Sequence, residues 1–421
     1  MADRFPPDKA KGAGAKGNTT SGSVADFRYK ASPPPDTTPP PQEDTEGEAA
    51  PLMEAASAPR DHTNHTQPPN GAHRPRPARR QAYAALDLGT NNCRLLIAKP
   101  AGEDFTVIDA FSRVVKLGEG LANSGRLSEK AMDRALGALA ICADKLRRRN
   151  VFLARSVATE ACRRASNGQR FIDRVREETG IVLDIISAQE EARLAVLGCH
   201  VLLEQSHGPA VIFDIGGGST ELVLIEPGEE QESNVPRILD WQSVPWGVVS
   251  LSDTIARKGD APEQRAARYA EMRQTVSDSF APFSTRVDSW RARPDRRLLG
   301  TSGTVTTLAS LHLELPHYDR QAVDGLIVPS ASMREICTRL AEMTWDERSA
   351  LPCIGHDRAE LVVAGCAILE AILDLWPTEQ LGVADRGIRE GILRSLMAAD
   401  LTPHSKAPSA SGTPGQSGAA L

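Results

Sequence analysis

The stretch PAVIFDIGGGSTELVLIE, residues 209–226, restricts the possible folds of this chain more than any other. Two apolar, β-branched runs flank a short polar turn, which is typical of a β-hairpin. Gly216, Gly217 and Gly218 carry no Cβ, so the backbone of the turn can approach a ligand closely. Such a turn can direct several N–H groups at one point, which is one way in which proteins bind phosphate oxygens. The hairpin is therefore a candidate phosphate loop.

Acidic residues border this turn. Asp214 ends the first apolar run and Glu221 begins the second, and Ser219 lies between them. Carboxylates would repel a phosphate unless a hard cation such as Mg²⁺ lay between the two. The alternative is an ordinary glycine-rich hairpin with solvated acids, because a single motif of this kind is a common false positive.

A second copy of the pattern favours the phosphate loop. Residues 83–100 read YAALDLGTNNCRLLIAKP, and Asp87 and Gly89 stand 127 positions before Asp214 and Gly216. Internal similarity at this spacing predicts two related domains, each of which presents a hairpin loop to a shared cleft.

The two copies differ at one charged position. At the same offset, Arg94 of the first copy corresponds to Glu221 of the second. The exchange indicates a division of labour in which one hairpin supplies a cation for phosphate and the other a carboxylate for metal or water.

Composition excludes several classes of protein. The net charge of −6 argues against a general nucleic-acid binder, although a local basic groove could still hold a polyanion. No apolar run approaches the roughly 20 residues of a membrane span, and no secretory signal precedes the first domain. Seven cysteines without a CxxC pair predict free thiols in a reducing cytoplasm. We therefore expect a cytoplasmic protein without nucleic-acid or membrane partners.

The chain divides into four parts by composition and pattern. Residues 1–80 are rich in Pro, Gly, Ser, Thr and Ala and predict a disordered tail, as do residues 401–421. Between them, strand and helix patterns alternate and then repeat, which predicts an α/β fold with a first domain over residues 81–206 and a second over residues 207–400. Three strands followed by helix, strand, helix, strand and helix are the order of a ribonuclease-H-like domain.

Individual elements can be placed along the chain. Ser128 is expected to cap a helix, residues 182–186 to form a strand, and residues 263–290 to form a helical segment. The sequence GTSGT, residues 300–304, lies between an apolar run and a further helical pattern. A small-residue turn at a helix N-terminus is a plausible anion site, although this motif alone is weak.

Two clusters of charged residues complete the candidate site. Glu190 and Glu191 open a predicted helix in SAQEEARL; acids are common in a first helical turn, but beside a bound phosphate one of them could deprotonate a water. Arg163 and Arg164 follow a predicted strand and could either clamp phosphate oxygens or lie on the surface.

Six motifs occur in one order: DLGTNNCRLLIA, ATEACRRASN, SAQEEARL, FDIGGGSTELV, GTSGTV and VADRGIREGIL. Together they resemble the exopolyphosphatase / guanosine pentaphosphate phosphatase family, within the superfamily of actin-like proteins, sugar kinases and chaperone ATPases. The resemblance covers residues 83–399, and the combined pattern is specific, whereas DIGGGST alone would indicate only the superfamily.

The resemblance implies two actin-like domains around a central cleft, and Mg²⁺-dependent release of terminal phosphate from polyphosphate or from guanosine pentaphosphate (pppGpp). It assigns the general base to Glu191 and implies a possible homodimer. It assigns metal association to Asp214 and Glu221. It places the following residues at the phosphates: Asp87, Gly89, Thr90, Asn91, Arg94, Arg163, Gly216, Gly217, Gly218, Ser219, Gly300, Thr301, Ser302 and Gly303.

Two departures and two rival functions accompany this resemblance. Long members continue into a further helical region, whereas this chain ends soon after REGIL and resembles a short form; its N-terminal extension also lies outside the family pattern.

One rival is an ATPase or kinase of the same superfamily. The other is a non-catalytic sensor of pppGpp or polyphosphate.

Overall fold

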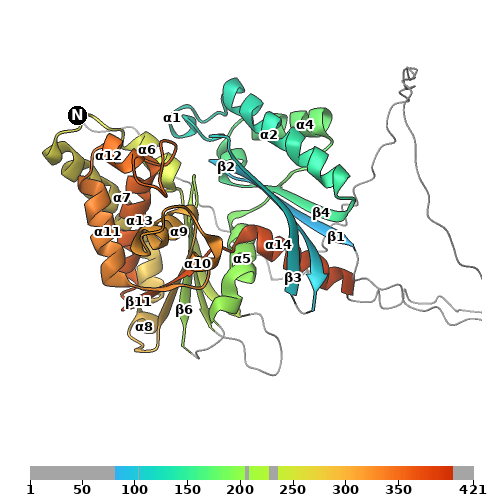
Figure 1. Ribbon diagram of the computed structural model, residues 1–421. Helices are drawn as coiled ribbons and strands as arrows, with labels where there is room; N and C mark the ends of the chain where they lie inside the picture. Colours follow the sequence, from blue (N-terminus) through green and yellow to red (C-terminus); the bar gives the residue numbers. More distant parts are fainter. Residues whose placement is uncertain (1–80, 103, 204–207, 227–235, 402–421) are drawn as a thin grey trace, which may run out of the picture.

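A computed structural model describes residues 81–102, 104–203, 208–226 and 236–401 (Figure 1). The two predicted disordered tails, residues 1–80 and 401–421, lie outside this part except for residue 401. Two lobes stand side by side, each built on a mixed sheet (Figure 1). The predicted α/β fold with two actin-like halves is confirmed.

The first lobe contains a sheet of five strands in the order β3-β2-β1-β4-β5. The first three strands are antiparallel, and β4 and β5 join in parallel. Its elements are β1 (Ala82–Leu88), β2 (Asn92–Ala101), β3 (Asp104–Val114), α1 (Leu121–Ser124), α2 (Glu129–Arg148), β4 (Val151–Ala158), α3 (Glu160–Arg164), α4 (Gly168–Thr179), β5 (Asp184–Ile185), α5 (Ala188–Cys199) and a 3₁₀ turn (His200–Leu203).

The second lobe repeats this order with one strand added. Its six-stranded sheet runs β10-β11-β9-β6-β7-β8, so β6, β7 and β8 match β1, β2 and β3. Its elements are β6 (Ala210–Ile215), β7 (Thr220–Glu226), β8 (Arg237–Val244), α6 (Val248–Thr254), α7 (Pro262–Arg286), α8 (Asp288–Arg291), β9 (Arg297–Thr301), α9 (Gly303–His312), α10 (Arg320–Val323), β10 (Ile327–Pro329), α11 (Ser330–Glu342), α12 (Trp345–Ser349), α13 (Leu361–Leu375), β11 (Gln380–Ala384) and α14 (Ile388–Leu401).

Most local predictions agree with these bounds. Ser128 caps α2, because its side chain accepts a hydrogen bond from Ala131 N. The helical segment expected over residues 263–290 is interrupted between α7 and α8. The strand expected over residues 182–186 is only two residues long, because the rest of that segment makes no ladder with β4.

Helices cover both faces of each sheet. One face of the first sheet packs on α2 and α4, and the corresponding face of the second packs on α7, α9, α11 and α13. The other two faces look toward α5 and α14, which lie between the sheets (Figure 1). No helix within the described ranges is long and apolar enough to cross a membrane.

Each of the two central helices packs on the sheet of the other lobe from the one that its place in the sequence predicts. From α5, Ala192 and Val196 pack against the second sheet, although α5 precedes that sheet in the chain. From α14, Ile392 and Leu396 pack against the first sheet, beside Tyr83. The chain thus crosses between the lobes twice, so the last helix of the predicted second domain completes the core of the first.

Candidate active site

The first hairpin loop is a tight turn between β1 and β2. Gly89 N donates to Asn92 O at 2.9 Å, and Thr90 and Asn91 project from the turn. Asp87 lies at the end of β1, directly opposite Arg94 in the antiparallel ladder. The turn and the strand ends beside it therefore place a carboxylate, a guanidinium and two polar side chains at one end of the first sheet.

The second hairpin loop repeats this geometry. Gly216 N donates to Ser219 O at 2.9 Å, as Gly89 N does to Asn92 O. Asp214 faces Glu221 in the ladder, in the place that Asp87 and Arg94 occupy in the first lobe. The correspondence inferred from the 127-residue spacing is therefore present in three dimensions.

The two loops touch each other. A Cβ placed on Gly218 would lie 2.6 Å from Thr90 Oγ1 and 2.9 Å from Glu160 Cγ, and one on Gly217 would lie 3.0 Å from Thr90 Cβ. A side chain on Gly218 would collide with Thr90 and Glu160, and one on Gly217 would force its neighbours to shift, so the close approach of the loops favours glycine at both positions. The loops are thus positioned to hold one group between them.

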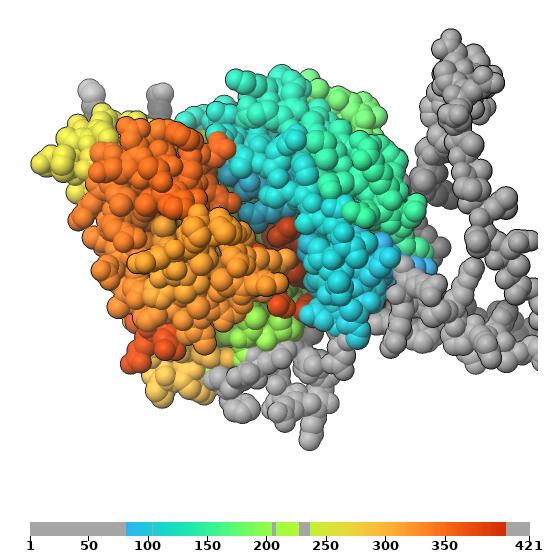
Figure 2. All heavy atoms as spheres, viewed as in Figure 1, coloured from blue at the N-terminus to red at the C-terminus, as the bar shows by residue number. Residues whose placement is uncertain are grey.

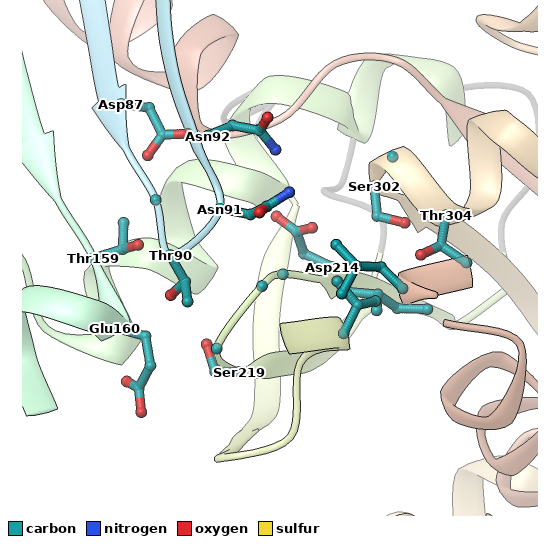
Figure 3. A pocket seen from close by; sticks show the side chains of 18 of the residues that line it. Asp87, Thr90, Asn91, Asn92, Thr159, Glu160, Asp214, Ser219, Ser302 and Thr304 are labelled. Atoms are coloured by element: carbon teal, nitrogen blue, oxygen red, sulfur yellow. The ribbon is translucent and has the colours of Figure 1, made fainter. Parts of the chain in front are cut away.

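A cavity of about 140 Å³ lies at this meeting point, within the groove between the lobes (Figure 2). Thr90, Thr159 and Glu160 line one side and Ser302 and Thr304 the opposite one, with Asp214 between them (Figure 3). The cavity brings together most of the predicted site: Asp87, Gly89, Thr90, Asn91, Arg94, Glu191, Asp214, Gly216, Gly217, Gly218, Ser219, Ser302 and Gly303.

The predicted turn at residues 300–304 is shorter than expected. Gly300 and Thr301 are the last residues of β9, and Gly300 packs on Phe213, where a Cβ would lie 2.4 Å from the ring. Thr301 donates to Arg386 O at 2.6 Å and lines an adjoining cavity. Ser302 caps α9 by accepting from Val305 N, so the helix N-terminus that lines the cavity begins at Ser302 and Gly303.

Glu190 and Glu191 have different surroundings. Glu190 accepts hydrogen bonds from Arg155 at 2.9 Å and Arg193 at 2.7 Å, which outweigh partial burial and keep the pKa of Glu190 below its ordinary value. Glu191 is only 7% exposed and lines the cavity. Burial, with the charge of Glu221 nearby, raises the pKa of Glu191 well above its ordinary value. Of the two acids, only Glu191 lines the cavity and has a raised pKa, and its assignment as the general base stays a prediction.

Arg163 braces Glu191. Its Nη1 and Nη2 each lie 3.1 Å from Glu191 Oε2, and Nη1 also donates to Ile186 O at 2.7 Å. Its Nε and Nη2 donate to Glu160 at 3.0 and 2.6 Å. All three guanidinium nitrogens thus have protein partners, and Arg163 is absent from the cavity lining; its predicted contact with phosphate stays a prediction.

The acids at the cavity fit a hard cation. Asp87 Oδ1 is buried and has no hydrogen-bond partner among the described residues, and burial raises the pKa of Asp87. Burial, followed by the charge of Glu221, raises the pKa of Asp214 to about 8. Two desolvated carboxylates suit Mg²⁺, which takes one or two protein carboxylates and keeps several waters.

The sequence assigned metal association to Asp214 and Glu221, and for Glu221 this stays a prediction. Glu221 is buried behind the loop, where its Oε1 accepts from Ser243 Oγ at 2.8 Å, and it does not line the cavity. Burial raises the pKa of Glu221 to about 6, although hydrogen bonds from Ser219 and Ser243 oppose this. Within the described part of the chain, no three His, Cys, Asp or Glu side chains gather as a metal centre. Asp87 and Asp214 are thus the acids that face the cavity.

Sequence reasoning missed two charged residues at the cavity. Arg358 lines it from the segment before α13, and its Nη1 donates to Thr307 Oγ1 at 3.1 Å. Glu160 lines the other side from α3. Glu160 lies in the motif ATEACRRASN but was not singled out there, whereas Arg358 lies in no motif, and only the packing of distant segments reveals it. Arg94 and Arg358 form no ion pair with any described residue, which leaves both cations available to an anion.

Comparison with known proteins agrees with this geometry. The sequence model of the Ppx/GppA phosphatase family matches residues 96–400 of this chain. The chain belongs to this family. The family resemblance predicted from six motifs is thereby confirmed, and the protein is a hydrolase of phosphoanhydride bonds.

Sequence relatives and solved structures match most of this chain. Exopolyphosphatase 2 of Mycobacterium tuberculosis is 31% identical over an alignment of 326 residues, which covers 74% of this chain and 98% of that protein. The crystal structure of an exopolyphosphatase from Cytophaga hutchinsonii has a TM-score of 0.67 and 27% identity, over 76% of this chain and 98% of that one. The Aquifex aeolicus member of the Ppx/GppA family has a TM-score of 0.61 and 28% identity, over 76% and 99%.

Proposed function

We propose that this protein is an exopolyphosphatase, which releases the terminal phosphate of inorganic polyphosphate by means of a water activated by Glu191. The single observation that carries the proposal is the meeting of two phosphate loops beside a buried glutamate. Relatives named exopolyphosphatase, aligned over nearly their whole length, support this choice of substrate.

The cavity is matched to a phosphoryl group. N–H groups and hydroxyls of the two loops can surround its oxygens, and Arg94 and Arg358 add positive charge at the cavity. Because phosphoryl transfer depends mostly on positioning and on neutralising the equatorial oxygens, these groups supply the main requirements of catalysis.

Glu191 would take the proton of the attacking water. Its carboxylate is desolvated, which makes it a stronger base than a solvated glutamate, and Arg163 holds it in one orientation. An intact base at the cavity favours an enzyme over the non-catalytic sensor considered from the sequence.

Mg²⁺ belongs to the proposal. Asp87 and Asp214 would hold it, and the ion would neutralise charge on the phosphates that enter the cavity. The protein groups themselves bind the terminal phosphate, orient the water and accept its proton.

The test is phosphate release by the purified protein with polyphosphates of several lengths, pppGpp and ATP measured side by side. We expect the highest kcat/KM with polyphosphate, loss of activity with EDTA, and recovery with added Mg²⁺. A higher value with pppGpp would reassign the substrate, and a higher value with ATP would favour the superfamily ATPase or kinase.

Two further expectations derive from the family resemblance and the composition. We propose a cytoplasmic location and a possible homodimer. Size-exclusion chromatography with light scattering tests the second, because a dimer would have twice the mass of the chain.

A further inference from the structure

The segment of residues 115–120, here called the rim loop, is fastened to the first phosphate loop. Two of its N–H groups donate to Asn91 O at 2.8 and 3.1 Å, and Gly118 N donates to Thr90 O at 2.9 Å. A Cβ on Gly118 would lie 2.2 Å from Thr90 Cγ2, so the two segments are also in close contact. The rim loop and the first phosphate loop are therefore one mechanical unit.

Helix α6 is fastened to the second phosphate loop in the same way. N–H groups at its start donate to Gly216 O at 3.0 Å and to Gly217 O at 2.8 Å. Ser250 Oγ donates to Gly218 O at 3.0 Å. A Cβ on Gly247 would lie 2.4–2.6 Å from the backbone of this loop. Helix α6 and the second phosphate loop form a second mechanical unit.

One hydrogen bond joins these two units across the groove. Gly120 N donates to Asp253 Oδ2 at 3.0 Å, and Asp253 is half-buried on α6. Figure 1 shows α1, which follows the rim loop, beside α6 at one end of the groove, and α5 and α14 at the other end. The bond is thus far from the helices that connect the lobes. At this distance, a change in the angle between the two lobes separates Gly120 and Asp253 most.

A second contact across the rim is weaker. Lys116 Nζ lies 3.2 Å from Asp357 Oδ1, but the two side chains are 45% and 66% exposed. Exposed ion pairs of this kind contribute little, because water and salt screen them. The Gly120–Asp253 bond is better shielded and joins a backbone N–H to a charged acceptor, which is among the stronger kinds of hydrogen bond.

We propose that Asp253 is a positioning residue: by accepting the N–H of Gly120 it holds the groove closed and fixes the separation of the two phosphate loops. Only the kinetic consequence of this proposal rests on the proposed phosphatase function. Loss of the bond increases the fraction of open molecules, and substrate must then close the groove with its own binding energy.

Kinetics test this role. We expect Asp253→Ala to lower kcat/KM for polyphosphate about tenfold through KM, while kcat changes less than about threefold, because bound phosphate bridges the loops itself. Asp253→Asn retains an oxygen acceptor and should restore most of the loss. Lys116→Gln removes the exposed contact and is the matched control, with KM within about twofold of wild type. A variant that was merely misfolded would lose kcat and keep its KM.

A distance measurement tests the same claim without turnover. Spin labels at Lys130 and Lys258, exposed positions of the two lobes, report the width of the groove in the full chain with Cys353→Ser. We expect Asp253→Ala to give a longer and broader distance distribution than the otherwise unchanged protein. Identical distributions, or an unchanged KM for Asp253→Ala, would overturn the proposal, whichever phosphate compound proves to be the substrate.

Discussion

Glu191 and its neighbour Glu190 offer a matched pair of variants. Successive helical positions point about 100° apart, and only Glu191 lines the cavity while Glu190 is bound by two arginines. We expect Glu191→Gln to lower phosphate release by roughly 10²–10⁴-fold, since a positioned general base contributes about that much. Glu190→Gln should cost far less. Steady-state phosphate release measures both, and equal losses would contradict the assignment of the base.

Glu160 should tune Glu191 through the arginine that they share. Burial raises the pKa of Glu191, so its reactive carboxylate is lost as the pH falls through this raised value. In Glu160→Gln, Arg163 pairs with Glu191 alone and favours the carboxylate. The acid limb of the kcat/KM profile should therefore move to lower pH. Glu177→Gln, on the exposed face of α4, is the control; an upward shift in Glu160→Gln, or none, would refute the coupling.

Sequence pattern located residues in turns better than residues in packed segments. The loops around Gly89 and Gly216 were predictable because a glycine-rich turn between two apolar runs has a local signature. The contact of Arg163 with Glu191 was not predictable, because α5 brings Glu191 to Arg163 only in the folded protein, whereas Glu160 is a local partner three residues before Arg163 on α3. Gly300 was expected at the turn, yet it faces Phe213 inside the sheet, a contact that no local pattern encodes.

At the level of elements, α5 and α14 cross without side chains between their backbones. A Cβ on Gly391 would lie 2.0 Å from Leu194 O, and one on Gly198 would lie 2.0 Å from Gly387 O. The helices that connect the lobes are thus as close as their main chains allow. A side chain at either position must push them apart.

Gly391→Ala should therefore destabilise the protein. We expect a loss of about 1–3 kcal/mol in the free energy of unfolding, the usual cost of overpacking. Gly137→Ala is the matched control in α2, where a Cβ would meet nothing within 4 Å, and it should stabilise by about 0.4–1 kcal/mol. Denaturant unfolding measures both variants. If Gly391→Ala were as stable as wild type, α5 and α14 would have to move apart without any loss in the free energy of unfolding.

The elements themselves were largely predictable, whereas their partners were not. Ser128 and Gly180 mark the ends of helices as capping chemistry requires. Sequence order, however, assigned α14 to the second half, although its apolar face covers the first sheet. The packing of α14 on the first sheet depends on the tertiary fold, which the periodicity of the sequence does not predict.

The whole molecule is a duplication whose two copies have diverged in charge. Corresponding hairpins bring Asp87 and Asp214 to one cavity, while Arg94 and Glu221 differ between the copies. Neither lobe alone has both loops, the basic residues and Glu191. The proposed reaction therefore requires both lobes, and we expect it to depend on their spacing.

The central claim is that water beside Glu191 attacks the terminal phosphorus of polyphosphate. The direct measurement is hydrolysis in ¹⁸O-labelled water, with the isotope located by ³¹P NMR in the products. We predict one solvent oxygen in each released orthophosphate and none in the shortened chain, because the terminal phosphoryl group lies between the loops. Label in the shortened chain would place the attack at the wrong phosphorus, and chain shortening without orthophosphate release would show cleavage at internal bonds and contradict release of the terminal phosphate.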